Sequence, residues 1–152
     1  MRLLFLGDSI TQGVGVSCPE NIYLNRIASN YHLKKANNYG ISGTRFARQR
    51  VPSQEPSFDR YFASRIPEMT EADGVVVFGG TNDYGHGDAP VGQMEDRSPW
   101  TFYGALHCLC KGLIERFPDS TIVIMTPLHR EFEDLDTPHL QPFVEAIRQV
   151  AE

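Results

Sequence analysis

The stretch FLGDSITQG, residues 5 to 13, places a serine between an acid and an isoleucine directly after a short apolar run. A serine hydroxyl is a weak nucleophile until a base takes its proton, and the tetrahedral oxyanion that its attack creates needs hydrogen-bond donors about 3 Å away. The backbone N–H of Ser9, at a turn from a strand into a helix, can supply one such donor. We therefore take Ser9 as the candidate nucleophile.

Two other glycine-rich stretches, NYGISG at 38–43 and GGTND at 79–83, offer further donors. The former has glycine N–H groups, and the latter has the side-chain amide of Asn82, a neutral and directional donor. Each stretch alone also fits a structural interpretation, in which Asp8 and Ser9 cap a helix, the glycines form tight turns and Asn82-Asp83 are turn residues. The three stretches together favour catalysis.

Strands and helices alternate along the chain. Short apolar runs predict strands buried on both faces at 2–6, Gly74–Phe78 and Thr121–Met125, with a weaker strand at 35–39. Apolar residues at helical spacing predict helices over 24–31 and over 142–152. A third helix carries its apolar residues over 102–113 and is predicted to open at Ser98-Pro99 and to close at Pro118. This alternation predicts an α/β domain with a parallel sheet, in which ligands bind at the carboxyl ends of the strands. All three glycine-rich stretches follow predicted strands, so we expect them to meet at that edge.

Composition and charge exclude several classes of function. Lys+Arg 14 against Asp+Glu 19 gives a net charge of −5, and no basic stretch is interleaved with aromatic residues, so we expect no nucleic-acid partner. Arg45, Arg48 and Arg50 form the only local basic cluster, which we interpret as ordinary solvated charge rather than an anion site. No histidine pair has metal-ligand spacing, so neither a metal nor another cofactor is expected. Residues 3–6 are too few for a signal peptide or a membrane span, which predicts a cytoplasmic protein if Met1 is the native start.

The three stretches also resemble a known family. GDSITQG at 7–13, NYGISG at 38–43 and GGTND at 79–83 are similar, in order and spacing, to the first three signature blocks of the SGNH or GDSL hydrolases, and TPLHRE at 126–131 is similar to members of this superfamily. The resemblance implies a flavodoxin-like three-layer α/β/α sandwich with a central parallel sheet. It also implies that Ser9 is the nucleophile and that Gly43 and Asn82 join the Ser9 amide as the oxyanion hole. Asp8 is then expected to brace the loop as an acceptor rather than to act as a catalytic acid.

The remaining motif of that family is an Asp-x-x-His pair after a fifth strand, whose histidine is the general base. Asp136-Thr137-Pro138-His139 has the spacing, but only a short polar stretch separates it from the fourth predicted strand, and no fifth apolar run follows Met125. The helix over 142–152 also reaches the last residue without a stop signal. We therefore expect residues 1–152 to be a single SGNH hydrolase domain, C-terminally incomplete, that lacks the last strand and the catalytic pair. The alternative is a compact variant in which His139 is the base.

These observations favour a serine esterase that cleaves small acyl groups, such as acetyl, from a carbohydrate or another small-molecule ester through an acyl-enzyme at Ser9. The absence of a long apolar stretch that would form an acyl tunnel favours short acyl groups. The alternative is a non-catalytic flavodoxin-like module that binds a phosphate, nucleotide or glycan with the same loops. Against that alternative, the sequence has neither GxGxxG nor GxxxxGK[ST], and its first loop carries no lysine or arginine.

Overall fold

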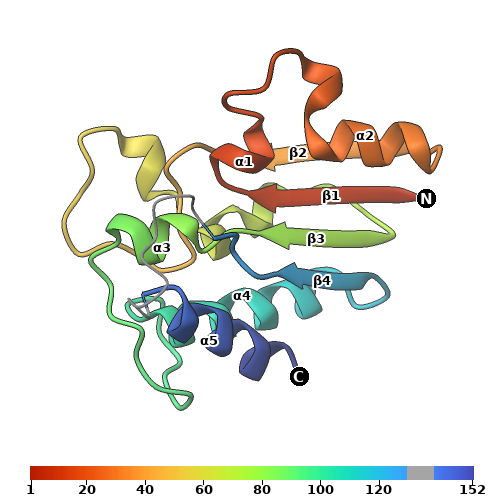
Figure 1. Ribbon diagram of the computed structural model, residues 1–152. Helices are drawn as coiled ribbons and strands as arrows, with labels where there is room; N and C mark the ends of the chain where they lie inside the picture. Colours follow the sequence, from red (N-terminus) through yellow and green to blue (C-terminus); the bar gives the residue numbers. More distant parts are fainter. Residues whose placement is uncertain (130–138) are drawn as a thin grey trace.

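The computed structural model of the protein describes residues 1–129 and 139–152 (Figure 1). In this part of the chain, four parallel strands form one sheet in the order β2-β1-β3-β4. The strands are β1 (Arg2–Gly7), β2 (Lys35–Gly40), β3 (Gly74–Phe78) and β4 (Thr121–Met125). The α-helices are α1 (Ser9–Gln12), α2 (Tyr23–Asn30), α3 (Thr81–His86), α4 (Phe102–Arg116) and α5 (Gln141–Ala151), and the 3-10 helices are η1 (Pro19–Asn21), η2 (Pro56–Asp59) and η3 (Phe62–Glu68).

One face of the sheet carries the main hydrophobic core. Because side chains alternate along a strand, Leu4 and Leu6 share this face with Val75 and Val77, which lie opposite them in register. They pack against buried apolar residues of η3, α4 and α5, among them Phe62, Phe102, Leu106, Leu109, Phe143 and Ile147. Burial of this face fixes the sheet on which the candidate site is built.

The opposite face is covered over only part of the sheet. The ring of Tyr23, on α2, makes edge contacts with Phe5 on β1 and Phe78 on β3. On β4 the same face carries Val123 and Met125, whose side chains are 46% and 38% exposed. The prediction that β4 is buried on both faces is therefore wrong. Among the described elements, the helices of this face, α1 and α2, lie beside β2 and β1 and not beside β4 (Figure 1).

The other predicted elements are confirmed within one or two residues at most boundaries. The exception is the start of α4, which begins at Phe102 and not at Ser98-Pro99. Thr101 is its N-cap, and the Thr101 hydroxyl accepts a hydrogen bond of 3.1 Å from the backbone N–H of Gly104. Across the residues that the structure describes, no helix is both long enough and apolar enough to cross a membrane.

Candidate active site

The three glycine-rich loops meet at the carboxyl edge of the sheet. Gly7, the last residue of β1, pairs in register with Gly40 at the end of β2 and with Phe78 at the end of β3. The loops that follow therefore leave the sheet side by side, at the edge where the arrowheads of β1, β2 and β3 lie in Figure 1. The expected convergence of these loops is confirmed.

Ser9 is the first residue of α1 and is half-buried. The preceding Asp8 is fully buried, and its carboxylate accepts a hydrogen bond of 2.9 Å from the backbone N–H of Ile10. Asp8 thus caps the turn that presents Ser9, which confirms its predicted role as a bracing acceptor.

Gly43 lies in the loop after β2, where only glycine fits without strain. Its φ of +74° is in the left-handed region, which L side chains rarely adopt. A Cβ at this position would also come within 2.5 Å of the Phe58 ring. The local structure therefore depends on glycine at the position where the sequence predicts an oxyanion donor.

Asn82 lies in the first turn of α3 and is 7% exposed. Its Nδ2 donates a hydrogen bond of 2.9 Å to the backbone carbonyl of Thr44, the residue after Gly43. An amide nitrogen carries two hydrogens, and the second has no partner among the residues that the structure describes. The bond to Thr44 holds the third loop against the second and fixes the direction of the remaining N–H.

Asp83 strengthens the same connection. Its buried carboxylate accepts hydrogen bonds of 3.0 Å from the backbone N–H groups of Phe46 and Ala47. Burial, partly offset by these two bonds, raises the pKa of Asp83 to about 7. The sequence suggests only a turn residue here, whereas the structure makes Asp83 a clamp on the loop that carries Gly43.

Arg65 is a second buried residue that joins these loops, and the sequence patterns do not predict it. The side chain is 1% exposed, and its guanidinium donates to the carbonyls of Gly7 and Tyr39 and to the hydroxyl of Thr44. Burial lowers the pKa of Arg65 to about 10, so the group stays charged at neutral pH. The available signal was an arginine within the apolar stretch FASRI of η3.

The basic cluster after Gly43 does not behave as predicted. Arg48 and Arg50 are exposed, as expected of solvated charge, but Arg45 is only 7% exposed. Its Nε and Nη1 atoms are buried and have no hydrogen-bond partner in the part of the chain that the structure describes. The interpretation as solvated charge is therefore wrong for Arg45. Arg45 attracts the carboxylate of Asp83 electrostatically and so acts to lower the pKa of Asp83.

The structure does not bring a histidine to the Ser9 hydroxyl. His139 is an exposed turn residue just before α5, and Asp136 lies outside the described residues. His86 and His129 are exposed at the carboxyl edge, at the end of α3 and shortly after β4. Among the residues that the structure describes, no side chain hydrogen-bonds to the Ser9 hydroxyl.

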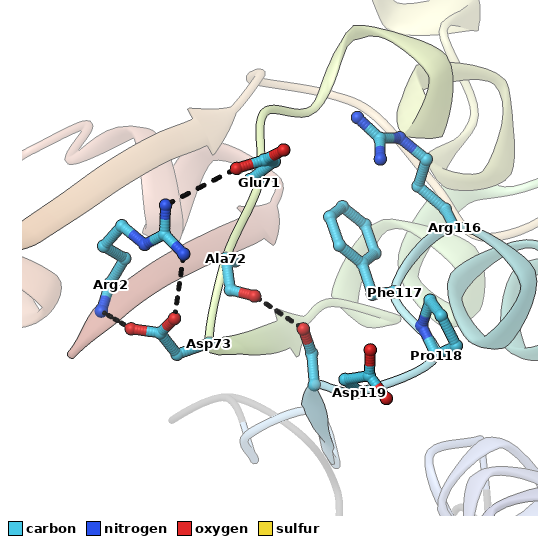
Figure 2. Close-up of a pocket in the computed structure, with 9 residues that line it drawn as sticks. Arg2, Glu71, Ala72, Asp73, Arg116, Phe117, Pro118 and Asp119 are labelled. Carbon is cyan, nitrogen blue, oxygen red and sulfur yellow. Dashed lines mark hydrogen bonds and ion pairs between the residues drawn. The ribbon is translucent and has the colours of Figure 1, made fainter.

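A hollow of about 410 Å³ lies at the opposite edge of the sheet, beside the first residues of β1, β3 and β4 (Figure 2). The Arg2 guanidinium forms ion pairs there with Asp73 at 3.0 Å and with Glu71 at 3.6 Å. This hollow is at the wrong end of the strands to receive a substrate of Ser9, so it has no part in the candidate site.

Comparison with known proteins agrees with the geometry. Residues 5–152 match the model of the GDSL-like lipase/acylhydrolase family. The chain belongs to this family. Membership makes it an ester-bond hydrolase, and the signature blocks recognised in the sequence are those that converge at the carboxyl edge. A comparison with the curated proteins found no match.

Several solved structures share the fold of this GDSL-like chain. A protein from Lactobacillus plantarum is 29% identical with a TM-score of 0.79, and the match covers 99% of this chain and 71% of that one. A GDSL-like protein from Bacteroides uniformis is 20% identical with a TM-score of 0.75, covering 99% and 80% of the two chains. A member of the lipolytic protein G-D-S-L family from Veillonella parvula is 17% identical with a TM-score of 0.62, covering 99% and 70%.

Proposed function

We propose that the protein is a serine esterase that transfers an acyl group from an ester to the Ser9 hydroxyl and then to water. The Ser9 oxygen attacks the acyl carbonyl while a general base takes its proton, and the alcohol leaves with a proton from the protonated base. A water molecule then attacks the acyl-enzyme in the same way and releases the acid.

The oxyanion formed in both steps is held by three donors in this proposal. They are the backbone N–H of Ser9, the backbone N–H of Gly43 and the side-chain amide of Asn82. The observation that carries the proposal is the 2.9 Å bond from Asn82 to the carbonyl of Thr44, since it ties the side-chain donor to the residue next to Gly43. Donors that are fixed before the substrate arrives need no reorganisation when charge develops.

A short acyl group, acetyl in the first instance, on a carbohydrate or another small alcohol is the proposed substrate. The sequence has no long apolar stretch that would line a tunnel for a fatty acyl chain. The residues that flank the site include Gln12, Ser42 and Thr81, which are polar, and these side chains suit a hydroxylated alcohol better than a lipid tail.

The test is hydrolysis of p-nitrophenyl acetate, butyrate and octanoate by the wild type and by Ser9→Ala. Imidazole is added in one series as an external base. We expect turnover that falls with acyl length and is lost in Ser9→Ala, while Ser29→Ala, at an exposed position of α2, keeps the wild-type rate. A wild type with no turnover above that of Ser9→Ala, with or without imidazole, would contradict the proposal, and a preference for octanoate would contradict the short acyl group.

A further inference from the structure

Arg65 is the most deeply buried basic residue among those that the structure describes, and its guanidinium contacts the loops of the candidate site. Nη1 donates to the carbonyl of Tyr39 at 2.7 Å and to the carbonyl of Gly7 at 3.2 Å. Nη2 donates to the same Gly7 carbonyl at 3.2 Å and to the Thr44 hydroxyl at 3.3 Å. Both Nη atoms therefore donate to the Gly7 carbonyl, and each also donates to a second acceptor, one on β2 and one in the loop after β2.

This arrangement is costly for a residue that serves stability alone. No carboxylate forms an ion pair with Arg65 among the described residues, and its Nε atom is buried without a hydrogen-bond partner. Asp8 and Glu68 attract the guanidinium electrostatically, but neither carboxylate forms an ion pair with it. A buried cation whose hydrogen bonds all go to neutral oxygens is less favourable than an apolar side chain of the same volume. The centre of the Phe62 ring lies 4.7 Å from the guanidinium carbon, and this cation–π contact offsets part of the free-energy cost of burial.

The three acceptors share one property: each belongs to a segment that positions a group proposed to act on the ester. Gly7 ends β1 two residues before Ser9, and Tyr39 is near the end of β2, where the loop to Gly43 begins. Thr44 directly follows Gly43. The Thr44 hydroxyl also donates to the carbonyl of Ile41 at 2.7 Å, so it links Arg65 to the backbone on the other side of Gly43.

We propose that Arg65 is a positioning residue for ester hydrolysis, which sets the separation between Ser9 and the Gly43 N–H by joining the end of β1, the end of β2 and the loop after β2. The proposal rests on the proposed esterase function. A lysine cannot replace the arginine in this role, because one ammonium group is a compact point charge and lacks the planar fork that reaches three acceptors in fixed directions. The role is indirect, because Arg65 contacts Gly7, Tyr39 and Thr44 and none of the groups proposed to act on the ester.

The test compares Arg65→Lys, Thr44→Val and a control, Arg116→Lys. Thr44→Val keeps the side-chain shape and removes the hydroxyl that Arg65 contacts, so it probes the same connection without removing a buried charge. The matched control is Arg116, which also donates to a backbone carbonyl, that of Met69 at 3.0 Å, and stacks on an aromatic ring, that of Phe117. It lies at the opposite edge of the sheet (Figure 2).

Two quantities are measured on each variant: kcat and KM for p-nitrophenyl acetate, and amide hydrogen exchange over residues 38–47. A misplacement of about 1 Å at a catalytic group costs roughly 10²-fold in rate, so we expect kcat of Arg65→Lys to fall by about that factor with little change in KM. Thr44→Val should lower kcat by a smaller factor in the same sense. Both should speed exchange over 38–47 and leave α4 protected, while Arg116→Lys should match the wild type in both quantities.

Each outcome separates this proposal from the one on which it rests. A wild-type kcat in Arg65→Lys, with turnover still dependent on Ser9, would overturn the positioning role alone, whatever the exchange rates are. Unchanged exchange over 38–47 would overturn it by showing that the loop does not depend on Arg65. If Arg65→Lys does not fold, Thr44→Val decides, and a wild-type kcat there overturns the proposal. A wild type without turnover that depends on Ser9, even with added imidazole, would instead overturn the esterase proposal.

Discussion

The side-chain amide of Asn82 is hydrogen-bonded at 2.9 Å to the carbonyl of Thr44, so the first turn of α3 is fastened to the loop that carries Gly43. The bond uses one of the two amide hydrogens and turns the other in a fixed direction. Asn82 is thus part of the structure of the loop and, in the proposed mechanism, a donor to the oxyanion. Substitutions at this position test both aspects.

Asn82→Ala removes the proposed side-chain donor, and we expect kcat for p-nitrophenyl acetate to fall by about 10²–10³-fold, as is typical when one oxyanion donor is removed. KM should change little, because the donor acts on charge that develops only in the transition state. The matched control is Asn25→Ala, since the Asn25 amide, on α2, also donates to a backbone carbonyl, that of Pro19 in η1 at 2.8 Å. An effect of Asn82→Ala confined to KM would make Asn82 a ground-state binder.

Gly43→Ala should destabilise the protein for two separable reasons. The left-handed backbone costs about 1–2 kcal/mol for an L side chain, and the new methyl group would overlap the Phe58 ring, which lies 2.5 Å from the Cβ position. Gly15→Ala is the matched control, because Gly15 also has a positive φ, +85°, but has no atom within 4 Å of a Cβ. We expect urea denaturation to give a larger loss of stability for Gly43→Ala than for Gly15→Ala.

The double variant Gly43→Ala/Phe58→Ala isolates the steric part. With the ring removed, the added methyl group has room, so the effect of Gly43→Ala in the Phe58→Ala background should shrink to the backbone cost seen at Gly15. Additive effects of the two substitutions would show that the Phe58 ring does not confine the loop at Gly43.

The sequence predicts the residues of the candidate site better than it predicts the burial of β4 and the role of Arg65. Apolar runs and glycines mark β1 and β3 because a parallel strand buried on both faces leaves a continuous apolar signal. The same signal misled at β4, since TIVIM does not reveal that one face of the strand lacks a covering helix among the described elements. Arg65 was missed for a related reason: its acceptors are backbone carbonyls and a hydroxyl, which carry no sequence signal and come together only in the folded chain.

The buried carboxyl of Asp83 should make stability depend on pH. Its pKa is raised from the ordinary value of 3.8 to about 7, so the native state binds this proton more tightly than the unfolded state does between these pH values. The free energy of unfolding should therefore fall as the pH rises through that window and level off above about pH 7. Urea denaturation at a series of pH values measures this slope, and Asp83→Asn should remove the part that Asp83 contributes.

Asp88 provides the matched control for that slope. It is an exposed carboxylate that also accepts two backbone N–H bonds, from Arg50 and Val51. Burial acts upward on its pKa but is outweighed by these bonds, so the pKa of Asp88 lies below its ordinary value. Its contribution to stability is present above the ordinary pKa and is lost only in more acidic solution, so Asp88→Asn should leave the slope above pH 5 as in the wild type. A slope in Asp83→Asn equal to that of the wild type would show that Asp83 titrates normally.

The spacing of His139 to Asp136 resembles that of the catalytic pair of the family. His139 is exposed and directly precedes Leu140, which is 6% exposed and buried at the start of α5. A general base must come within about 2.6–3.2 Å of the Ser9 hydroxyl, directly or through one water molecule. We expect that His139 does not, so His139→Ala should leave turnover of p-nitrophenyl acetate by the 152-residue chain at the wild-type value. Added imidazole should raise the turnover of both proteins equally, after subtraction of the rate with Ser9→Ala, because an external base then takes the Ser9 proton. Turnover that disappears in His139→Ala and returns with imidazole would instead make His139 the general base, with Asp136 as the residue that orients it.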